Sequence, residues 1–514
     1  MEHQLLALEA LFTEDQLKFL QSYDRITFTV EEIAMIGIAQ RKNYGKPHFI
    51  HCTFAEYFVA DFLINQLTRK TKQNKLLKDF LLNKVLLQKV CHVIRAFLNR
   101  QLEITKPSTE ALKEYGELLD EQWNKGEVHG SLISDTTALH EAAAENNDHI
   151  IALLLDSLKS GPNSKALRVI LLAKNKHGNT AWHVAAEAGH IKVVENLWIW
   201  AKAQLDSSEL KNEVLLGKDS TESTAWHSAA QWGRVQILVK LWDWAAEVHI
   251  KPNELRDGVF LSRDLINWTS WHTATAYGHV EVLEKMWEWA KQLQLKPEEL
   301  WYELWMSKDY YGTTAWKMAA SGGHVEVLEK LWYWAKELQL KPQELRNRVL
   351  LSRDVVKKTA WHMAAESGRV EVLEKLWEWA KELPLKPEEL LYEVLLSKYF
   401  FDYMAWHLAA ESGHVEILEK LWEWAKQLQL KPEELWLSKD ISGNTAWQIA
   451  ARQGHVKVLE KLWDWANEIQ LKREELRNEV LFLKFEFENT SRAKEVVPCY
   501  FEILEKLRDW AKEL

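Results

Sequence analysis

The chain of 514 residues is poor in cysteine, proline and glycine. Its three cysteines, Cys52, Cys91 and Cys499, lie far apart, which suits a reducing compartment and argues against a disulfide-stapled secreted scaffold. No apolar run reaches the roughly 18 residues that a membrane span needs. The N-terminus, from Met1, lacks the basic-then-apolar order of a signal peptide. We therefore expect a folded cytoplasmic protein without a membrane span.

Basic charge is scarce outside one stretch. The net charge is −10, yet residues 69–100 hold nine Lys and Arg against the single acid Asp79. The rest of the chain is therefore strongly acidic, and we expect no nucleic-acid partner, because phosphate attraction dominates such binding. The basic stretch fits an acidic partner or an anionic membrane surface. We favour the simpler interpretation, in which its lysines solvate amphipathic helices. The expected buried side is Leu76, Leu77, Phe80, Leu81, Val85, Leu86, Val90, Val93 and Phe97.

Tryptophan is abundant, with 28 residues, and most of them recur at fixed positions of a repeat. The repeat reads T-A-W-H-x-A-A-x-x-G-H-V-E-V-L-E-K-L-W-E-W-A-K-E-L-Q-L-K-P-E-E-L. Its copies begin at Thr137, Thr180, Thr224, Thr269, Thr314, Thr359, Met404 and Thr445, with a decayed one near Thr490. A fixed period of this length indicates a solenoid of units that bury their apolar faces against one another. We interpret the tryptophans as inter-repeat packing rather than as a cofactor site.

Each copy predicts two helices joined by a tight turn. In the copy at Thr314, that residue is a plausible N-cap for a short helix over 315–320. Gly323 stands where the chain must turn, at a positive φ that glycine adopts without a side-chain clash. A second helix is expected over 325–338.

A third, short helix is expected after these two. The second helix has an apolar arc broader than a simple two-helix contact needs, so another element must pack on it. Pro342 opens the stretch L-K-P-Q-E-L-R-N-R-V-L-L, which has proline at a first helical position and then apolar residues at helical spacing. We predict this helix at Pro342 to Leu351 and in most other repeats. It should be stunted in the shorter copy between Met404 and Thr445.

The stretch T-A-W-H-x-A-A-x-x-G-H-V-E-V-L resembles the ankyrin-repeat signature T-P-L-H-x-A-A-x-x-G-H-x-E-V-V-x-x-L-L. Ala replaces Pro here, Trp replaces Leu, and about 12 residues are added after the second helix. The resemblance covers residues 137 to about 470. It implies stacked helical repeats that recognise other proteins.

Enlarged repeats of this kind resemble those attached to NACHT-type NTPases of the STAND signalling class. Upstream, F-I-H-C-T-F-A-E-Y-F, from Phe49 to Phe58, resembles a stretch that ends the winged-helix region of NACHT proteins. The chain has no G-x-x-x-x-G-K-[S/T] motif, and Gly45-Lys46-Pro47 lacks the residues that hold phosphate and Mg²⁺. The resemblance therefore implies the tail of such a protein, and we expect no nucleotide hydrolysis.

Histidine recurs at two repeat positions, one after the first Trp and one after the turn glycine. The resemblance implies that the first set bonds the backbone between repeats and that the second supports the inter-helix turn. The exceptions are Lys317 and Gln448 in the first set and Arg234 and Arg369 in the second. A metal site would not survive such replacements. His48 and His51 would point to opposite faces of a strand that includes residues 49–52, so they cannot share a zinc ion. We expect no metal, no cofactor and no catalytic residue.

The informative variation lies in the turns between repeats, where aromatic and apolar residues replace the expected polar ones. These residues are Leu265, Ile266, Trp268, Tyr310, Tyr311, Val355, Val356, Tyr399, Phe400, Phe401 and Tyr403. Stacking would align the four turns into one ridge, and exposed aromatic patches mark interaction sites. Trp232 and Tyr277 vary at a first-helix position that we expect nearby. In the alternative interpretation, these side chains fold back onto adjacent repeats.

We predict a mainly α fold, an ankyrin-like α-solenoid with an extra short helix per repeat. A small winged-helix-like part over residues 1–68 and a basic helical connector over 69–130 should precede it. About nine repeats, including degenerate caps, should fill residues 131–514.

The expected function is recognition of one or more proteins, with the resemblance placing it in the sensor arm of an innate-immune or stress-signalling NACHT-type protein. Two alternatives stay open. The chain is an autoinhibitory or decoy fragment that binds a full-length NTPase through residues 69–100, or it is an enzyme whose active site has no familiar motif.

Overall fold

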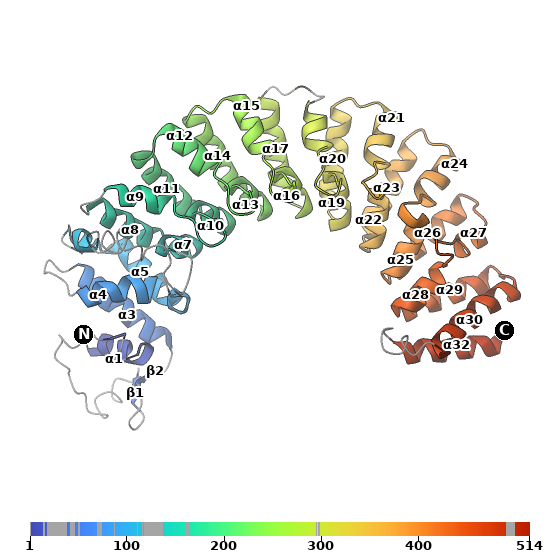
Figure 1. Ribbon diagram of the computed structural model, residues 1–514, viewed down its shortest axis with the longest axis horizontal. Helices are drawn as coiled ribbons and strands as arrows, with labels where there is room; N and C mark the ends of the chain where they lie inside the picture. Colours follow the sequence, from blue (N-terminus) through green and yellow to red (C-terminus); the bar gives the residue numbers. More distant parts are fainter. Residues whose placement is uncertain are drawn as a thin grey trace. The chain divides into compact units, whose positions relative to one another are not determined.

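The computed structural model is helical in both of the compact units into which the chain divides, Met1–Leu265 and Ile266–Leu514 (Figure 1). It describes residues 2–13, 16–17, 39–41, 47–49, 52–68, 75–86, 88–109, 111–115, 117, 137–160, 164–293, 296, 299–489 and 499–514. The start of the decayed copy, residues 490–498, and two residues of the upstream motif, Ile50 and His51, lie outside the described residues.

The N-terminal unit begins with a helical region. Its elements are α1 (Glu2–Leu11), β1 (Ala39–Arg41), β2 (Pro47–Phe49), α3 (Cys52–Leu67), α4 (Lys75–Asp79), the π-helix η2 (Phe80–Leu86), the short η3 (Lys89–Cys91) and α5 (His92–Ile104). Strands β1 and β2 pair antiparallel, with Ala39 opposite Phe49. The strand ends at Phe49 and Cys52 already begins α3, so the strand considered over residues 49–52 was too long.

The basic connector packs on the first repeat. Its expected buried residues Leu77, Phe80, Leu81, Val85 and Leu86 are buried, and Val93 and Phe97 are half-buried. Leu76 and Val90 are exposed, which corrects the prediction for these two positions. Asn99 of α5 accepts hydrogen bonds from the backbone N–H groups of His149 and Ile150, so it satisfies two donors in the first turn of α8 (Asp148–Ser160).

Three repeats follow in the N-terminal unit. Their first helices are α7 (Ala138–Ala144), α10 (Ala181–Ala188) and α13 (Ala225–Gln231), and their second helices are α8 (Asp148–Ser160), α11 (Ile191–Gln204) and α14 (Val235–Glu247). The third elements are α9 (Ser164–Leu171), α12 (Ser207–Glu209) with η4 (Leu210–Leu215), and α15 (Pro252–Leu255) with η5 (Arg256–Phe260). Each first helix packs on the next within the unit.

Five repeats and a final helix make up the C-terminal unit. First helices are α16 (Ser270–Ala276), α19 (Ala315–Gly322), α22 (Ala360–Glu366), α25 (Ala405–Glu411) and α28 (Ala446–Gln453). Second helices are α17 (Val280–Gln292), α20 (Val325–Glu337), α23 (Val370–Glu382), α26 (Val415–Gln427) and α29 (Val456–Glu468). Third elements are η6 (Leu300–Trp305), α21 (Pro342–Glu344) with η7 (Leu345–Leu350), α24 (Pro387–Glu389) with η8 (Leu390–Leu395), α27 (Pro432–Trp436) and α30 (Arg473–Asn489). A short 3-10 turn, η9 (Phe400–Asp402), lies between repeats, and α32 (Tyr500–Glu513) ends the chain.

The predicted repeat is confirmed. Thr314 is the N-cap of α19, and Gly323 follows it with φ +84°. The additional helix is present, and in the short copy it is only the five-residue α27, as expected. The fold class predicted from the sequence, an ankyrin-like α-solenoid with an extra short helix per repeat, is therefore confirmed.

The extra helices differ from the prediction in one respect, because most of them continue as π-helix. In η7, the N–H of Leu351 bonds to the carbonyl of Arg346, five residues back. Such bonding places residues four and five apart over the same turn. Leu345, Val349 and Leu350 are buried together in this way. The repeated spacing L-x-x-x-V-L therefore indicates a π-helix in the sequence itself.

The tryptophans join neighbouring repeats as predicted. In each group of three, the first two indoles belong to one repeat and the third comes from the second helix of the next. The groups are Trp182, Trp198 and Trp244 in the N-terminal unit, and 271/287/334, 316/332/379, 361/377/424, 406/422/465 and 447/463/510 in the C-terminal unit. Trp332 and Trp379, for example, stack with ring centroids 5.1 Å apart. Such pairs contribute about 0.5–1.5 kcal/mol beyond their buried area.

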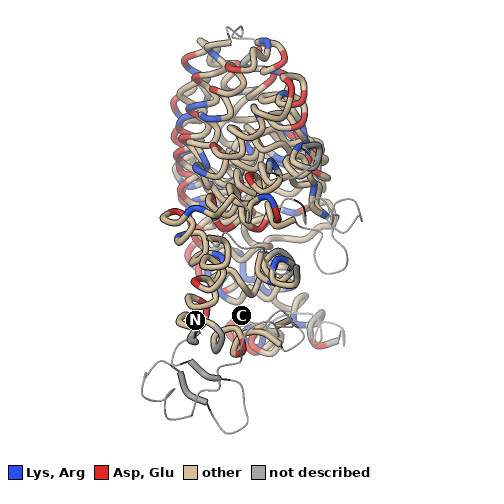
Figure 2. The backbone as a smooth tube through the Cα atoms, turned by 90° about the vertical axis from the view of Figure 1, so that its left-hand side faces the viewer, with Lys and Arg blue, Asp and Glu red and all other residues tan. Residues whose placement is uncertain are grey.

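Ion pairs connect the same helices at the surface. Lys375 of α23 lies 3.2 Å from Glu329 of α20, and four further junctions of the C-terminal unit repeat this geometry. These are Lys330–Glu284, Lys420–Glu374, Lys461–Glu419 and Lys506–Glu460, and Lys240–Glu195 is their equivalent in the N-terminal unit. Acidic and basic positions are accordingly interspersed along the stacked helices (Figure 2). Each pair is exposed and contributes about 0.2–1 kcal/mol.

Candidate functional site

An aspartate holds most of the turns between repeats, with Asn175 in its place in the first turn and Tyr399 in the turn of residues 397–403. Asp309 Oδ1 accepts hydrogen bonds from the backbone N–H groups of Tyr311 (2.9 Å) and Thr313 (2.7 Å). Asp354 does the same for the two equivalent N–H groups of the next turn, those of Val356 and Lys358. The carboxylate therefore fixes the turn from inside. The two residues that follow each aspartate are left at the tip.

Consecutive turns lie side by side in the C-terminal unit. The N–H of Tyr310 bonds to the carbonyl of Ile266, and the N–H of Phe400 bonds to that of Val356, both at 3.1 Å. Between these two pairs, Val355 packs so closely that a Cβ at Gly312 would lie 2.9 Å from it. The stacking that the sequence argument assumed is therefore present.

Five side chains at these tips are exposed, and we call them the turn ridge: Tyr310, Tyr311, Val355, Val356 and Phe400. Tyr310 is 78% exposed, Val355 71% and Phe400 51%. Ile266 at the preceding turn and Ile441 at the following one are exposed as well. Ile441 was missed by the sequence argument, although it directly follows Asp440 as Val355 follows Asp354.

Other predicted ridge residues fold back onto the repeats. Tyr399 is half-buried against the ring of His362 at 5.3 Å, and Tyr403 lies against His407 at 5.6 Å. Burial, reinforced by nearby carboxylates, raises the pKa of both phenols. Trp268 is also half-buried and donates its indole N–H to Asp309. For these three residues the alternative interpretation holds.

Three further predicted residues are placed differently. The side chain of Phe401 lies outside the described part of the structure. Tyr277 is half-exposed, but it is the C-cap of α16, whereas the turn precedes the N-cap Thr269. Seven helical residues, about 10 Å, separate the two ends, so Tyr277 is not part of the ridge. Trp232, in the N-terminal unit, is likewise an exposed C-cap, that of α13.

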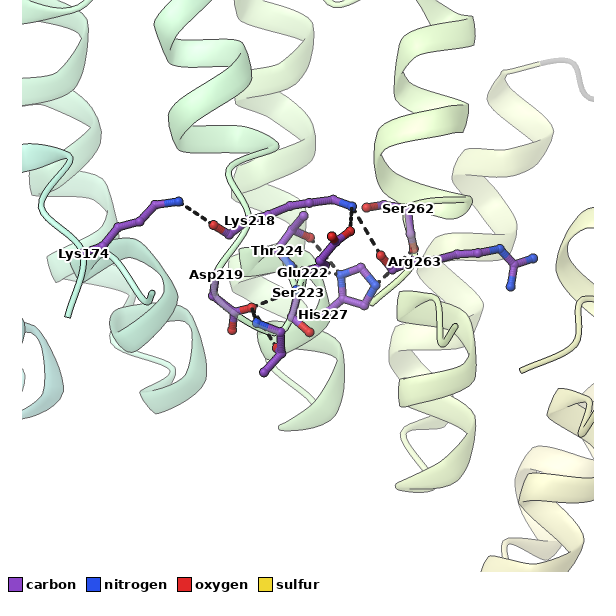
Figure 3. Close-up of polar contacts among 10 residues, drawn as sticks. Lys174, Lys218, Asp219, Glu222, Ser223, Thr224, His227, Ser262 and Arg263 are labelled. Atoms are coloured by element: carbon purple, nitrogen blue, oxygen red, sulfur yellow. Dashed lines mark hydrogen bonds and ion pairs between the residues drawn. The ribbon is translucent and has the colours of Figure 1, made fainter. Parts of the chain in front are cut away.

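A row of basic residues beside the turns was missed. One Lys or Arg precedes the turn in each repeat: Lys174, Lys218 and Arg263 in the N-terminal unit, and Lys308, Arg353, Lys398 and Lys439 in the C-terminal unit. In Figure 3, Lys174 Nζ donates to the carbonyl of Lys218, whose own Nζ reaches the carbonyl of Arg263 and the carboxylate of Glu222. In the C-terminal unit, Arg353 donates to the carbonyl of Lys398 at 2.8 Å. The recurring S-[K/R]-D motif could have indicated this row of basic residues from the sequence.

The first histidine set bonds backbone as the resemblance implied. His362 Nδ1 lies 2.8 Å from Thr359 Oγ1, and its Nε2 lies 2.8 Å from the carbonyl of Ser397. The same arrangement recurs at His140, His183, His227 and His272. Burial lowers the pKa of His362 to about 4, so the ring is neutral at physiological pH. Both nitrogens of this neutral ring are engaged in hydrogen bonds, so the histidine has a structural role.

Lys317 is the unusual member of this row. It is fully buried, and the hydrogen-bond partner of its Nζ among the described residues is the carbonyl of Gly312, at 3.5 Å. Burial lowers its pKa to about 8, against the opposing charge of Asp354. This lysine therefore makes a weaker connection than the histidines do.

The second set supports an inter-helix turn, as expected, but it is the turn of the preceding repeat, so these side chains also link repeats. His324 Nε2 bonds to the carbonyl of Ala276 in the preceding repeat, and Arg369 Nε bonds to that of Ser321. Arginine can therefore replace histidine here without loss of the bond. These side chains also cover the turn glycines, and a Cβ at Gly323 would lie 2.8 Å from Cδ of Arg369.

Within the described ranges, no three His, Cys, Asp or Glu side chains are grouped to hold a metal ion. None of the helices in that same part of the chain combines the length and apolar character that a bilayer span requires. The expectations that the protein is no enzyme and needs no cofactor stay predictions.

Comparison with protein families matches residues 110–208 to the family described as ankyrin repeats (3 copies). This range contains α7, α8, α9, α10 and α11. A search of curated proteins finds no match for the chain. Ankyrin repeats are therefore present in this part of the protein, and they support a role in protein–protein interaction.

Proposed function

We propose that this protein is a recognition scaffold that binds a partner protein through the turn ridge. The observation that carries the proposal is the exposure of five large apolar or aromatic side chains on adjacent turns. Such patches mark interaction surfaces, and aromatic residues dominate the binding energy of interfaces.

The turns are also well prepared for binding. Asp309 and Asp354 fix their backbones, and hydrogen bonds join neighbouring tips. A surface that is already ordered loses little conformational entropy when a partner docks. The tryptophan groups behind it supply the rigid support.

A pull-down comparison tests the proposal. The ridge variant changes Tyr310, Tyr311 and Phe400 to Ser, and the control changes Tyr333 and Tyr392 to Ser. The control tyrosines are 64% and 62% exposed, close to the 65% of Tyr311, but they lie on α20 and η8 rather than on the turns. A partner that the unchanged protein retains should be lost from the ridge variant and kept by the control. Retention of every partner by the ridge variant would refute the proposal.

For the biological setting, we propose the sensor arm of a NACHT-type signalling protein, on the resemblance of residues 49–58 and of the enlarged repeats. A Walker motif in the genomic sequence upstream of Met1 would support it, and an unrelated upstream domain would overturn it. The inhibitory or decoy alternative requires free charge in residues 69–100. Two of those residues, Lys78 and Arg95, form ion pairs with Glu114 and Glu145, which weakens this alternative.

An unrecognised enzyme is the remaining alternative. A screen of the purified chain for nucleotide hydrolysis and esterase activity should find neither. Turnover that depends on a specific side chain would contradict the scaffold proposal.

A further inference from the structure

The turn ridge is bordered by positive charge, and this feature indicates the chemistry of a partner. We propose that the ridge and its basic border bind an extended acidic segment of a partner protein, with one acidic side chain at every third residue. The inference rests on the proposed function and adds the class of the partner. It concerns the C-terminal unit alone.

The charge at the turns is opposite in sign to that of the whole chain. Residues 307–313, 352–358, 397–403 and 438–444 carry six basic and four acidic side chains, whereas the chain has a net charge of −10. Asp309 and Asp440 are buried inside their turns, where they accept backbone hydrogen bonds. Among these turn residues, Lys308, Arg353, Lys357, Lys398 and Lys439 are exposed, and the one exposed acid, Asp402, lies 3.8 Å from Lys398. The surface that a partner meets is therefore basic.

The spacing of the basic residues is set by the repeat. Each turn contributes two backbone segments, since Lys308 pairs with Thr314 across the turn and the next turn follows directly. Paired segments lie about 4.8 Å apart, so equivalent residues of consecutive turns lie about 10 Å apart. The helices stacked behind the turns have a similar separation, about 8–10 Å.

A peptide in the polyproline II conformation matches this spacing. It has about three residues per turn and a rise of about 3.1 Å per residue, so every third side chain returns to the same face after about 9 Å. One acidic side chain per triplet would meet one basic residue per repeat. The apolar residues between them would meet Tyr310, Val355 and Phe400 of the ridge.

Two other modes of binding fit less well. A partner cannot simply add a β-strand between the tips at Val356 and Phe400, because a hydrogen bond already joins them. Single-stranded nucleic acid could stack on the tyrosines, but a long polyanion would also meet the acidic side chains of a chain whose net charge is −10. A short acidic peptide carries fewer charges, so the acidic side chains around the turns repel it less.

The test measures fluorescence anisotropy of labelled probes with the full chain at low ionic strength. The first probe consists of four Glu-Pro-Leu triplets, one for each turn. The second has the same composition with its glutamates adjacent, the third carries Gln in place of Glu, and the fourth is single-stranded oligothymidylate of matching length. The first probe should bind about tenfold more tightly than the second and third. Equal affinity for the first two, or tighter binding of the oligothymidylate, would overturn the proposal.

Charge-reversed variants locate the site. Lys357→Glu with Lys398→Glu should weaken the first probe about tenfold, and added salt should reduce the difference. The control, Lys381→Glu with Lys472→Glu, removes the same charge from exposed positions away from the turns and should bind as the unchanged protein does. Circular dichroism checks that both variants fold, and Gln at positions 357 and 398 provides a milder change. Equal weakening by the control would place binding elsewhere and overturn the proposal.

The two proposals fail separately. If the acidic probe does not bind but the ridge variant still loses its protein partner, the acidic-segment inference is wrong and the recognition function stands. If the probe binds through Lys357 and Lys398 while the ridge variant keeps every protein partner, the role of the aromatic ridge is wrong.

Discussion

Arg95 of α5 and Glu145, the C-cap residue of α7, form a bidentate ion pair inside the N-terminal unit. The Arg95 side chain is almost fully buried, and its Nη1 also donates to the carbonyl of Val85 at 2.9 Å. The pair therefore connects the helical region to the first repeat and satisfies a carbonyl of the π-helix η2. It explains why a basic residue of this stretch is not on the surface.

Replacing Arg95 by Ala should destabilise this junction by about 3–5 kcal/mol, because the remaining carboxylate loses its buried partner. Hydrogen exchange of the α5 and α8 amides measures the local free energy of opening. Replacing both residues together, Arg95→Met with Glu145→Met, should cost less than the single change. A double variant that is as unstable as the sum of the two single variants would contradict the coupling.

Lys317→His should stabilise the C-terminal unit and reduce its pH dependence. The folded-state pKa of Lys317 is about 8, below the ordinary value of 10.5, so folding penalises the charged form. Stability should therefore rise with pH between about 8 and 10.5, and the full penalty, up to roughly 3 kcal/mol, applies below pH 8. Urea unfolding at pH 7 and pH 10 should show this slope for the unchanged protein and a weaker one for the variant. Parallel pH profiles would contradict the assignment.

Two glycine replacements separate backbone strain from crowding. Gly323→Ala should cost about 1–2 kcal/mol for the left-handed backbone and more for the contact with Arg369. Gly443→Ala has the same backbone, with φ +81°, but no atom lies within 4 Å of the added Cβ. Gly443→Ala should therefore lower the free energy of unfolding by the backbone contribution alone. Thermal unfolding compares the stability of the two variants. Equal losses of stability would contradict a cost of crowding against Arg369.

Trp510→Ala should release the last helix while leaving the preceding repeats folded. The indole of Trp510 stacks on Trp463 at 4.9 Å and lies 5.2 Å from Trp447. Removing a buried Trp side chain costs about 3–5 kcal/mol. Hydrogen exchange should show lost protection in α32 and little change in α23. The exposed neighbour Asp509→Ala is the control, and full protection of α32 in the Trp510 variant would contradict the docking role.

The repeats, their helices and their turn glycines followed from the sequence, because those features depend on contacts that recur at every junction. The turn residues were less easily separated into exposed and buried ones from the sequence. Tyr310 is exposed and Tyr399 lies on His362, and the two occupy different positions of the repeat. Tyr399 stands where Asp309 and Asp354 accept backbone hydrogen bonds from inside their turns, whereas Phe400 is the equivalent of Tyr310. The register of the repeat could therefore have separated the two, but the particular ring that Tyr399 packs against depends on side-chain packing, which periodicity does not encode.

Two other results could have been predicted from spacing but were interpreted otherwise. The interval between Leu345, Val349 and Leu350 fits a π-helix, although an α-helix was expected there. The basic residue of the S-[K/R]-D motif recurs with the same regularity, but no prediction was made for it. Its role in bonding the next turn, as Arg353 bonds the carbonyl of Lys398, becomes evident from coordinates.

The ion pair between Lys375 and Glu329 has a consequence for how such a gene can change. Because equivalent pairs recur along the C-terminal unit, the two sides of most junctions there are chemically interchangeable. Unequal crossing-over that deletes or duplicates one repeat length would rejoin surfaces that already fit. Array length can therefore vary between alleles or related genes without a new interface having to evolve.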